Sequence, residues 1–441
     1  MTVHERAGTP ARPEDLVDVD ALLAAYAATH PDPSVDVQRV AFGTSGHRGS
    51  AFTATFNDDH IAATSQAIVE YRAAQGTDGP LFLGRDSHAL SEPAWLTAAE
   101  VFAANGVDVV VDSRDGLTPT PAISHAILVT NAGRDGRHLA DGVVVTPSHN
   151  PPADGGFKYN PPDGGPAGTE ATSWIADRAN QLLENGLKEV RRARFDAAAA
   201  HRYDYLGTYV DQLDQVLDMA AVRDAGVTIG ADPLGGASVD YWGVIAQRWG
   251  LDLTVVNPDV DPAFGFMTLD WDGKIRMDCS SPYAMASLRA RMEADPAPFT
   301  IATGNDADAD RSTASSPRRR RPDEPATDYL AVAIPRLPVR PPSRPARGRG
   351  GVGHRRNARP AMLIDRVRRS DPALAPPGWS RCPSGFKRLC SATARRSSGT
   401  ARLRARARRS CARDGSPWST DGRACCSPLP SSRASAPVRS T

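Results

Sequence analysis

Short apolar runs alternate with longer stretches of helical period through the first part of the chain. Apolar residues recur at helical spacing over residues 58–75, behind Asp58 as a cap, and Ser91 can cap a second helix. A third helix is predicted at residues 120–128. The apolar runs between these helices are short enough for buried strands, which we predict at 81–84, 107–112 and 142–146. This alternation indicates βαβ units and a mostly parallel sheet.

The same pattern restarts after a polar, helix-prone stretch at residues 169–200. Helices are predicted near 203–223, up to Trp249, and near 282–293. The strands between and after them are predicted at 227–232, 251–257 and 299–304. The sequence therefore predicts a second α/β domain of similar build.

The periodic pattern stops after Arg311. The remaining residues are rich in Arg, Pro and Ser and show no sustained period of 2 or 3.6, so we expect them to be largely disordered. We accordingly divide the chain into an N-terminal helical extension (1–35), two α/β domains (36–200 and 201–311) and a basic tail (312–441).

The charge changes at the same boundary. The whole chain has a formal net charge of +1, but residues 312–441 hold 29 Lys and Arg against 7 Asp and Glu. A basic arm of this kind can neutralise nucleic-acid phosphates. It contains no interleaved aromatic residues and no RNA-binding motif, so nucleic-acid binding is the less favoured function.

Cysteine use and hydropathy indicate a cytoplasmic protein. Only Cys279 lies in the first 311 residues, which is typical of a reducing compartment. The first 20 residues lack the apolar segment of a signal peptide, and no run approaches the roughly 20 apolar residues of a membrane span. We expect no membrane association, and either a monomer or a dimer.

The first candidate site follows the strand at 142–146, in "TPSHNPP". Ligands of open α/β sheets bind beyond the carboxyl ends of strands, where Ser148 lies. Prolines 147, 151 and 152 stiffen this loop, and His149 and Lys158 are polar neighbours that could assist the hydroxyl. Lys158 is one of only four lysines in the chain. The alternative is an ordinary Ser/Asn/Pro turn.

The second candidate site is "TGNDADADR", at the end of the strand at 299–304. In extended backbone Asp306, Asp308 and Asp310 would point the same way and repel one another unless a cation lies among them. Hard carboxylate ligands suit Mg²⁺, and the glycine and glutamate of an EF-hand are missing. The alternative is a solvated acidic turn.

Two further loops carry candidate residues. "FGTSGHRGS" at 42–50 combines three glycines, which permit close backbone approach to a ligand, with Arg48, which can bind phosphate. In "LGRDSHALSEPA", Arg85 and Asp86 follow another strand, and a structural ion pair is the favoured reading of those two residues. A metal, a serine in a rigid loop and phosphate-binding cations together indicate phosphoryl transfer.

These segments, with "TPTPAISHAI" and "VVVTPSHNPPADGGFKYNPPDGGPA", resemble the α-D-phosphohexomutase superfamily over residues 36–311. The "GGFKYNPPDGGPA" extension resembles its bacterial phosphoglucomutase branch. The resemblance implies two consecutive phosphohexomutase-type α/β domains with mixed, mostly parallel sheets. It also implies an intramolecular phosphotransferase that interconverts glucose 1-phosphate and glucose 6-phosphate through a phosphoserine and glucose 1,6-bisphosphate. Phosphomannomutase and phosphoglucosamine mutase are alternatives within the superfamily.

The resemblance also implies a role for each matching residue. Ser148 would be the phosphorylated residue, and one of its oxygens would join Asp306, Asp308 and Asp310 around one Mg²⁺. Lys158 and Arg48 match the family's active-site base and acid candidates, and we expect the pKa of Lys158 to be lowered. His149 and Arg311 match residues that line the same centre, and Arg48 and Arg311 would bind phosphate.

The tail departs from the family pattern. Family members have a third domain with a Glu-Glu-Ser sugar loop and a fourth that binds the distal phosphate, whereas Glu324 is the one glutamate in the tail. Islands at 329–334, 362–367, 384–389 and 413–422 resemble third-domain segments in the family's order. We interpret the tail as partly out of frame, with the fourth domain lost, and expect impaired activity.

Overall fold

The computed structural model describes residues 2–43, 46–294, 296, 298–315 and 330–333. All described residues lie within one compact unit, Met1–Val352. This unit contains a seven-stranded and a five-stranded sheet. Among the tail islands, only residues 330–333 are described, and the rest lie outside the described residues.

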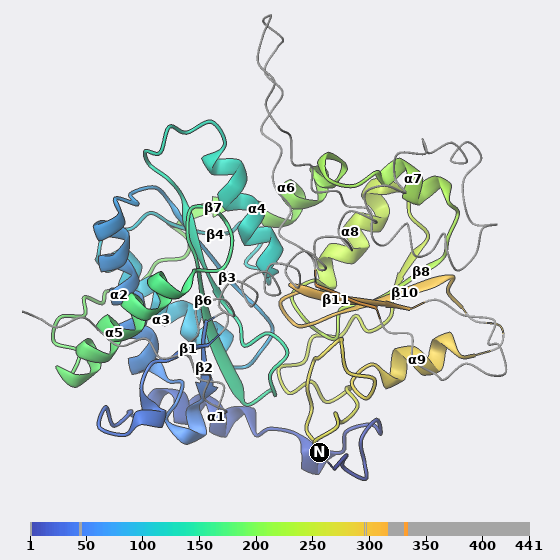
Figure 1. Ribbon diagram of the computed structural model, residues 1–441, viewed down its shortest axis with the longest axis horizontal. Coiled ribbons are helices and arrows are strands. Elements are labelled where there is room, and N and C mark those ends of the chain that lie inside the picture. Colours follow the sequence, from blue (N-terminus) through green and yellow to red (C-terminus); the bar gives the residue numbers. More distant parts are fainter. Residues whose placement is uncertain (1, 44–45, 295, 297, 316–329, 334–441) are drawn as a thin grey trace, which may run out of the picture. The chain divides into compact units, whose positions relative to one another are not determined.

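The first sheet has the strand order β1-β2-β6-β5-β3-β4-β7 (Figure 1). Its strands are β1 (Phe42–Gly43), β2 (Gly46–Ser50), β3 (Leu81–Arg85), β4 (Val109–Asp112), β5 (Asp141–Val145), β6 (Asp154–Asn160) and β7 (His201–Tyr203). β5, β3, β4 and β7 are parallel, whereas β5 pairs with β6, β6 with β2 and β2 with β1 in antiparallel register. The antiparallel part places β6 directly beside the loop that follows β5.

Two hydrophobic cores cover the two faces of this sheet. Alternate strand residues point to opposite faces, so Leu81 and Leu83 join one core and Phe82 the other. The first core is completed by α1 (Val19–Ala28), α2 (Asp58–Gln75), α3 (Ser91–Ala104) and α5 (Thr169–Glu184). The second contains α4 (Thr120–Asn131), α6 (Tyr205–Asp211) and Tyr241 of α8 (Val239–Trp249).

The second sheet has the order β12-β11-β10-β8-β9. Its strands are β8 (Ile229–Asp232), β9 (Leu253–Val255), β10 (Ile301–Asn305), β11 (Arg311–Ser315) and β12 (Leu330–Ala333). β10, β8 and β9 are parallel, and β11 and β12 extend the sheet in antiparallel register. The unit also contains α7 (Met219–Asp224) and α9 (Ala286–Met292). A third core lies here and includes the buried free thiol of Cys279.

The α/β class with two mixed sheets is confirmed by this architecture. The boundaries at residues 200 and 311 stay predictions, and both lie close to sheet strands. β7 follows residue 200 but pairs with β4 of the first sheet. β11 begins at residue 311 and β12 follows it, and both belong to the second sheet. Residues 330–333, within the island that resembles a third-domain segment, form β12, an edge strand of the second sheet.

The N-terminal extension contacts both halves of the unit. The backbone N–H groups of His4, Gly8 and Ala11 donate to the carbonyls of Trp271, Leu269 and Met267 at 2.7–2.9 Å. Further along, α1 buries Leu22 and Tyr26 in the first core. The extension therefore links the loop region before α9 to the first sheet.

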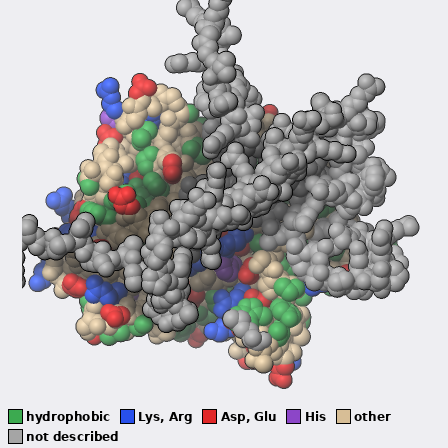
Figure 2. Space-filling model, viewed as in Figure 1, with side chains coloured by type: hydrophobic (Ala, Val, Ile, Leu, Met, Phe, Trp, Pro, Cys, Tyr) green, Lys and Arg blue, Asp and Glu red, His purple; other side chains and the backbone are tan. Residues whose placement is uncertain are grey.

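The surface of the described residues carries mixed charge. On the face shown in Figure 2, acidic and basic side chains lie among hydrophobic ones. None of the helices in the described part of the chain is both long and apolar enough to cross a membrane.

Two buried histidines, one on β2 and one on α2, make stability depend on pH. His47 stacks on Phe56 with ring centroids 5.8 Å apart, and burial lowers its pKa to about 3. Burial also lowers the pKa of His60, whose ring lies 5.2 Å from that of His47. Below its ordinary pKa of about 6.5, each histidine takes up a proton in the unfolded chain before it does so in the folded chain.

We therefore expect the free energy of unfolding to fall as pH falls from about 6.5, by up to about 1.4 kcal/mol per pH unit for His47 alone. Urea denaturation at several pH values measures this slope, and His47→Gln should reduce it. Val37→Ala is the control, because Val37 is exposed, has no titratable group and should leave the slope unchanged. Equal slopes for wild type and His47→Gln would contradict the prediction.

Candidate functional site

The serine loop leaves the first sheet at the carboxyl end of β5. Ser148 lies fully buried in this loop with a φ of 61°, in the left-handed region that residues other than glycine rarely adopt. β6 pairs with β5 and returns beneath the loop. A Cβ atom at Gly156 of β6 would lie 2.1 Å from the carbonyl oxygen of Thr146, so only glycine allows this approach.

The three aspartates occupy a turn between β10 and β11 instead of the extended segment that we expected. The N–H of Ala309 donates to the carbonyl of Asp306 at 2.9 Å, and Ala309 has a φ of 57°. This turn brings one carboxylate oxygen each of Asp306, Asp308 and Asp310 within 4.8 Å of one another. The clustering therefore comes from a tight turn and not from strand alternation.

The serine loop and the aspartate turn meet directly. The Ser148 Oγ donates to Oδ2 of Asp306 at 2.6 Å, and Nη1 of Arg311 donates to Ser148 Oγ at 2.9 Å. A second link joins the hydroxyl of Thr120, the first residue of α4, to Oδ2 of Asp308 at 2.5 Å. Residues 158 positions apart thus share one buried polar centre.

Burial and mutual repulsion govern the charges of this centre. Burial, together with the charges of Asp308 and Asp310, raises the pKa of Asp306 well above its ordinary value. For Asp308, burial raises the pKa, but the neighbouring ammonium of Lys158 lowers it more, and the net shift is downward. The centre therefore requires positive charge close to the aspartates.

Lys158 supplies part of that charge from β6. Its Nζ lies 2.6 Å from Oδ2 of Asp308 and 3.0 Å from Oδ2 of Asp310, and its side chain is only 4% exposed. Burial lowers the pKa of Lys158, but the two carboxylates raise it more, so the net shift is upward. Our expectation of a lowered pKa is wrong for this arrangement, because the nearest charges are negative.

The other predicted residues surround the same centre. His149 Nδ1 lies 3.4 Å from Ser148 Oγ and is hydrogen-bonded to Arg311 Nη1. Burial, followed by the charge of Arg311, lowers the pKa of His149. Burial also lowers the pKa of Arg48, and the charges of Asp308 and Arg311 are close enough to influence it.

The glycines around Arg48 have a structural role. A Cβ atom at Gly46 would lie 2.6 Å from the carbonyl of Phe157, and one at Gly49 would lie 2.4 Å from that of Thr55. They let β2 pack closely on neighbouring backbone, which holds Arg48 beside the centre. That these glycines also permit the approach of a ligand stays a prediction.

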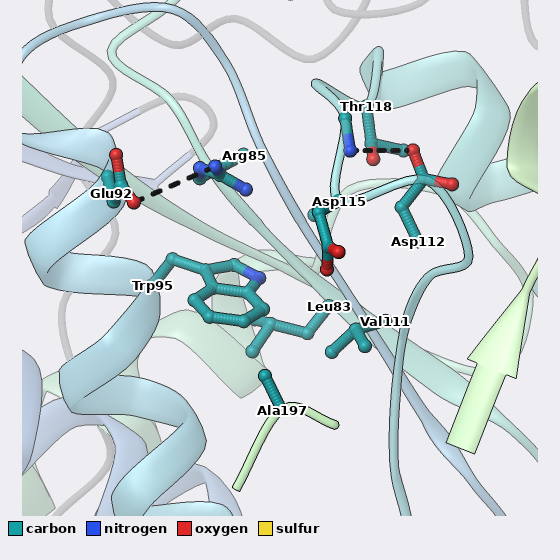
Figure 3. A pocket seen from close by; sticks show the side chains of 11 residues that line it. Leu83, Arg85, Glu92, Trp95, Val111, Asp112, Asp115, Thr118 and Ala197 are labelled. Atoms are coloured by element: carbon teal, nitrogen blue, oxygen red, sulfur yellow. Dashed lines mark hydrogen bonds and ion pairs between the residues drawn. The ribbon is translucent and has the colours of Figure 1, made fainter. Parts of the chain in front are cut away.

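Arg85 and Asp86 do not pair with each other. Arg85 lies 3.9 Å from Glu92 and stacks over the ring of Trp95, whereas Asp86 is paired with His88. Arg85, Glu92 and Trp95 line a cavity of about 230 Å³ at the carboxyl ends of β3 and β4, opposite Asp112 and Asp115 (Figure 3). The acidic groups across this cavity are paired with Arg114 and Arg202, so it shows no unpaired group that would select a ligand.

The sequence analysis missed one residue of the centre, Thr120. Besides its hydroxyl contact, its backbone N–H donates to the carbonyl of Asp308 at 2.9 Å. The sequence signal was the Thr-Pro-Thr-Pro segment at the start of a helix, where free N–H groups attract acceptors.

Comparison with known proteins identifies relatives of this chain. Residues 39–185 match the phosphoglucomutase/phosphomannomutase family, alpha/beta/alpha domain I. The chain is 54% identical over 332 residues to a phosphoglucomutase of Komagataeibacter xylinus, covering 74% of this chain and 59% of the relative. It is 29% identical to a phosphoglucosamine mutase of Synechococcus sp. (strain WH7803), covering 66% and 56%.

The chain thus shares its first domain with the phosphoglucomutase/phosphomannomutase family.

A solved structure shows a similar fold. The exocytosis-sensitive phosphoprotein pp63/parafusin, a phosphoglucomutase from Paramecium, matches in its open form with a TM-score of 0.51 and 19% identity. The match covers 65% of this chain and 54% of the Paramecium protein. The chain thus spans less than two thirds of the length of each of these relatives.

The aspartate turn of this chain could hold a metal ion. Oδ1 of Asp308 and Oδ1 of Asp310 are buried and have no hydrogen-bond partner among the described residues. Unpaired buried carboxylate oxygens are costly, and a divalent cation would satisfy them. Asp306, Asp308, Asp310 and Ser148 Oγ are therefore the atoms that would hold it, and when bound it would neutralise charge on a phosphoryl group.

We expect Mg²⁺ to stabilise the folded chain and Asp308→Asn to remove most of this effect. At a Mg²⁺ concentration about 100-fold above Kd, binding should raise the free energy of unfolding by about 2.7 kcal/mol. Thermal unfolding with and without Mg²⁺ measures this difference. Asp272→Asn is the control, because Asp272 is paired with Arg276 outside the cluster. A Mg²⁺ response that persists unchanged in Asp308→Asn would contradict the assignment.

Proposed function

We propose that the chain transfers a phosphoryl group between a hexose phosphate and Ser148, as a phosphoglucomutase does. The observation that carries this proposal is the position of the Ser148 hydroxyl, 2.6 Å from the Asp306 carboxylate and 2.9 Å from the Arg311 guanidinium. A serine hydroxyl is a weak nucleophile by itself and needs a neighbouring proton acceptor or a metal. Here an acceptor and a phosphate-binding cation lie on either side of it.

The transfer step balances with the groups present. The bond between phosphorus and a sugar oxygen of glucose 1,6-bisphosphate breaks, and a bond between phosphorus and Ser148 Oγ forms. The hydroxyl proton leaves toward Asp306, and the departing sugar oxygen takes up a proton. Lys158, which is charged and buried beside the aspartates, and Arg48 are our candidates for the group that donates it.

The residues around Ser148 fit a phosphorylated serine as well as a free one. Arg311 reaches the serine oxygen with a planar guanidinium that can bind two phosphate oxygens at once. His149 lies within 3.4 Å of the same oxygen, and Mg²⁺ would neutralise further charge. We therefore propose Arg48 and Arg311 as phosphate-binding residues, with glucose 1,6-bisphosphate as the donor.

Glucose 1-phosphate and glucose 6-phosphate are the substrates that the comparison favours. The phosphoglucomutase relative shares 54% identity, whereas the phosphoglucosamine mutase relative shares 29%. The phosphoglucosamine and phosphomannose alternatives therefore rank second.

Incubation of the full chain with Mg²⁺ and glucose 1,6-bisphosphate should add one phosphoryl group to Ser148. Mass spectrometry of the peptide that contains Ser148 detects it, and Ser148→Ala should show none. Arg311→Lys should slow the transfer on the order of 100-fold, because an ammonium cannot replace the planar guanidinium. Ser65→Ala is the matched control, since Ser65 is equally buried and its hydroxyl has no partner among the described residues. Phosphorylation elsewhere, with Ser148 unmodified, would overturn the proposal.

Isomerisation should be much slower than phosphorylation of Ser148. Binding energy from the sugar and its far phosphate normally orients the substrate, and residues 312–441 contain a single glutamate and so no Glu-Glu-Ser sugar loop. We expect a deficit of about 100-fold or more in turnover of glucose 1-phosphate, measured by coupling to glucose 6-phosphate dehydrogenase. Turnover of glucose 1-phosphate as fast as phosphorylation of Ser148 would show that other residues of this chain bind the sugar.

A further inference from the structure

The backbone of Ser148 is held in an unfavourable conformation by specific partners. A serine with a φ of 61° persists only where the surroundings impose that conformation. The N–H of Ser148 donates to Oγ1 of Thr146 at 2.8 Å, within the same loop. The hydroxyl of Thr146 in turn donates to Oδ2 of Asp86 at 2.6 Å.

The direction of this chain of hydrogen bonds is fixed. A threonine hydroxyl has one hydrogen, and a carboxylate can only accept. Because the hydrogen of Thr146 points to Asp86, its lone pairs remain to accept the Ser148 N–H. Asp86 therefore determines the orientation of the group that holds Ser148.

Asp86 lies in the loop after β3 and is the central hydrogen-bond acceptor of this network. Its carboxylate also accepts from the hydroxyl of Ser91 at 2.6 Å, the N–H of His88 at 3.0 Å and Nδ1 of His88 at 2.9 Å. With Thr146, four donors converge on two oxygens in the protein interior. This set of donors requires an ionised carboxylate.

His88 is hydrogen-bonded to the other end of the serine loop. Its Nε2 lies 3.1 Å from the carbonyl oxygen of Asn150, two residues after Ser148. Both ring nitrogens thus face oxygen acceptors, and an imidazole that donates twice is protonated. Burial lowers the pKa of His88, but the charge of Asp86 raises it more, which agrees with a charged ring.

The other groups that face His88 preserve this charge. The carboxylate of Asp154 at the start of β6 contributes a smaller favourable interaction, and the ring of Phe264 packs on the imidazole with centroids 4.9 Å apart. Lys274 and Arg276 lie near Asp154 and offset part of its charge. Asp86 and His88 thus form a buried, nearly neutral pair that contacts the loop on both sides of Ser148.

We propose that Asp86 and His88 are positioning residues that hold Ser148, through Thr146 and Asn150, in the conformation in which its hydroxyl faces Asp306 and Arg311. This inference rests on the proposed function of Ser148. A charged hub specifies one geometry more strictly than apolar packing, because each misplaced donor would leave a buried polar group unpaired. It also lets the loop keep its shape when a doubly charged phosphoryl group is added to its tip.

Thr146 offers a matched pair of variants for the test. Thr146→Val keeps the shape but removes the hydroxyl, and should slow phosphorylation of Ser148 by about 10- to 100-fold. Thr146→Ser retains the hydroxyl and should restore most of the rate. Thr64→Val is the control, because Thr64 is fully buried and its hydroxyl has no partner in the described structure. If Thr146→Val lowers thermal stability but leaves the rate in the folded fraction unchanged, the network is only structural and the proposal is wrong.

Asp86→Asn tests the charged pair without relying on activity. Nitrogen NMR of histidine-labelled full chain should show both ring nitrogens of His88 protonated at pH 7 in the wild type, and a neutral ring in Asp86→Asn. Hydrogen exchange at the Ser148 amide should be about 10-fold faster in that variant. A neutral His88 in the wild type, or unchanged exchange in Asp86→Asn, would refute the positioning role.

These two readouts also separate the two proposals. If the wild type shows a charged His88 and a protected Ser148 amide but takes up no phosphoryl group from glucose 1,6-bisphosphate, the proposed function fails while the positioning geometry stands. If phosphorylation occurs at equal rates in the wild type and Asp86→Asn, the proposed function stands and the positioning role fails.

Discussion

Three carboxylates on one buried turn repel one another, and the surroundings of the candidate site can be understood as a response to that repulsion. Asp306 and Asp308 are fully buried, so solvent does not screen the repulsion between their charges. Lys158 and Arg311 approach them from two different sheets, and Ser148 and Thr120 donate hydrogen bonds to the same carboxylates. The concentration of negative charge thus explains why four separate segments converge here.

Close packing of backbone makes this convergence possible. Gly236 lies after β8, and a Cβ atom there would be 2.5 Å from the Cα of Ala307, inside the aspartate turn. Gly156 plays the corresponding role under the serine loop, beside Thr146. At each position a side chain would displace the loop that packs on the glycine: the aspartate turn at Gly236 and the serine loop at Gly156. The glycines therefore fix how closely each loop packs on its own neighbour, while the charged groups set the chemistry of the centre.

The sequence predicted most of the parallel strands and helices well, because they have a clear apolar period. The exceptions are the parallel strand β7, which was not predicted, and the single helix predicted near 203–223, which is divided into α6 and α7. β3, β5 and α2 lie within a residue of the predicted ranges. β6 was not predicted: its segment begins Asp-Gly-Gly and has little of the β-branched character of a strand, and its pairing partners β2 and β5 determine its conformation instead. Strands of this kind depend on tertiary contacts that a local pattern does not reveal.

The candidate site was predictable as a set of residues but not as a geometry. The chemistry of Ser148 and the aspartates could be read from their types and from the strands before them. Their arrangement could not, because it depends on a tight turn at Ala309 and on the left-handed backbone at Ser148, neither of which contains glycine. Likewise, Asp86 was expected to pair with its neighbour Arg85, whereas the structure gives it His88 and Thr146.

The same reasoning shows why the polar network under the serine loop belongs with the aspartate turn. Ser148 has to present its hydroxyl to Asp306 while its own backbone is held in a conformation that the residue disfavours. Contacts to the aspartates alone would act on the side chain and leave the backbone free to relax. Hydrogen bonds to Thr146 and His88 instead hold the Ser148 N–H and the Asn150 carbonyl in place. If Ser148 is the nucleophile that we propose, contacts to both its hydroxyl and its backbone preorganise it, so the cost of orienting it is met by folding and not at each transfer.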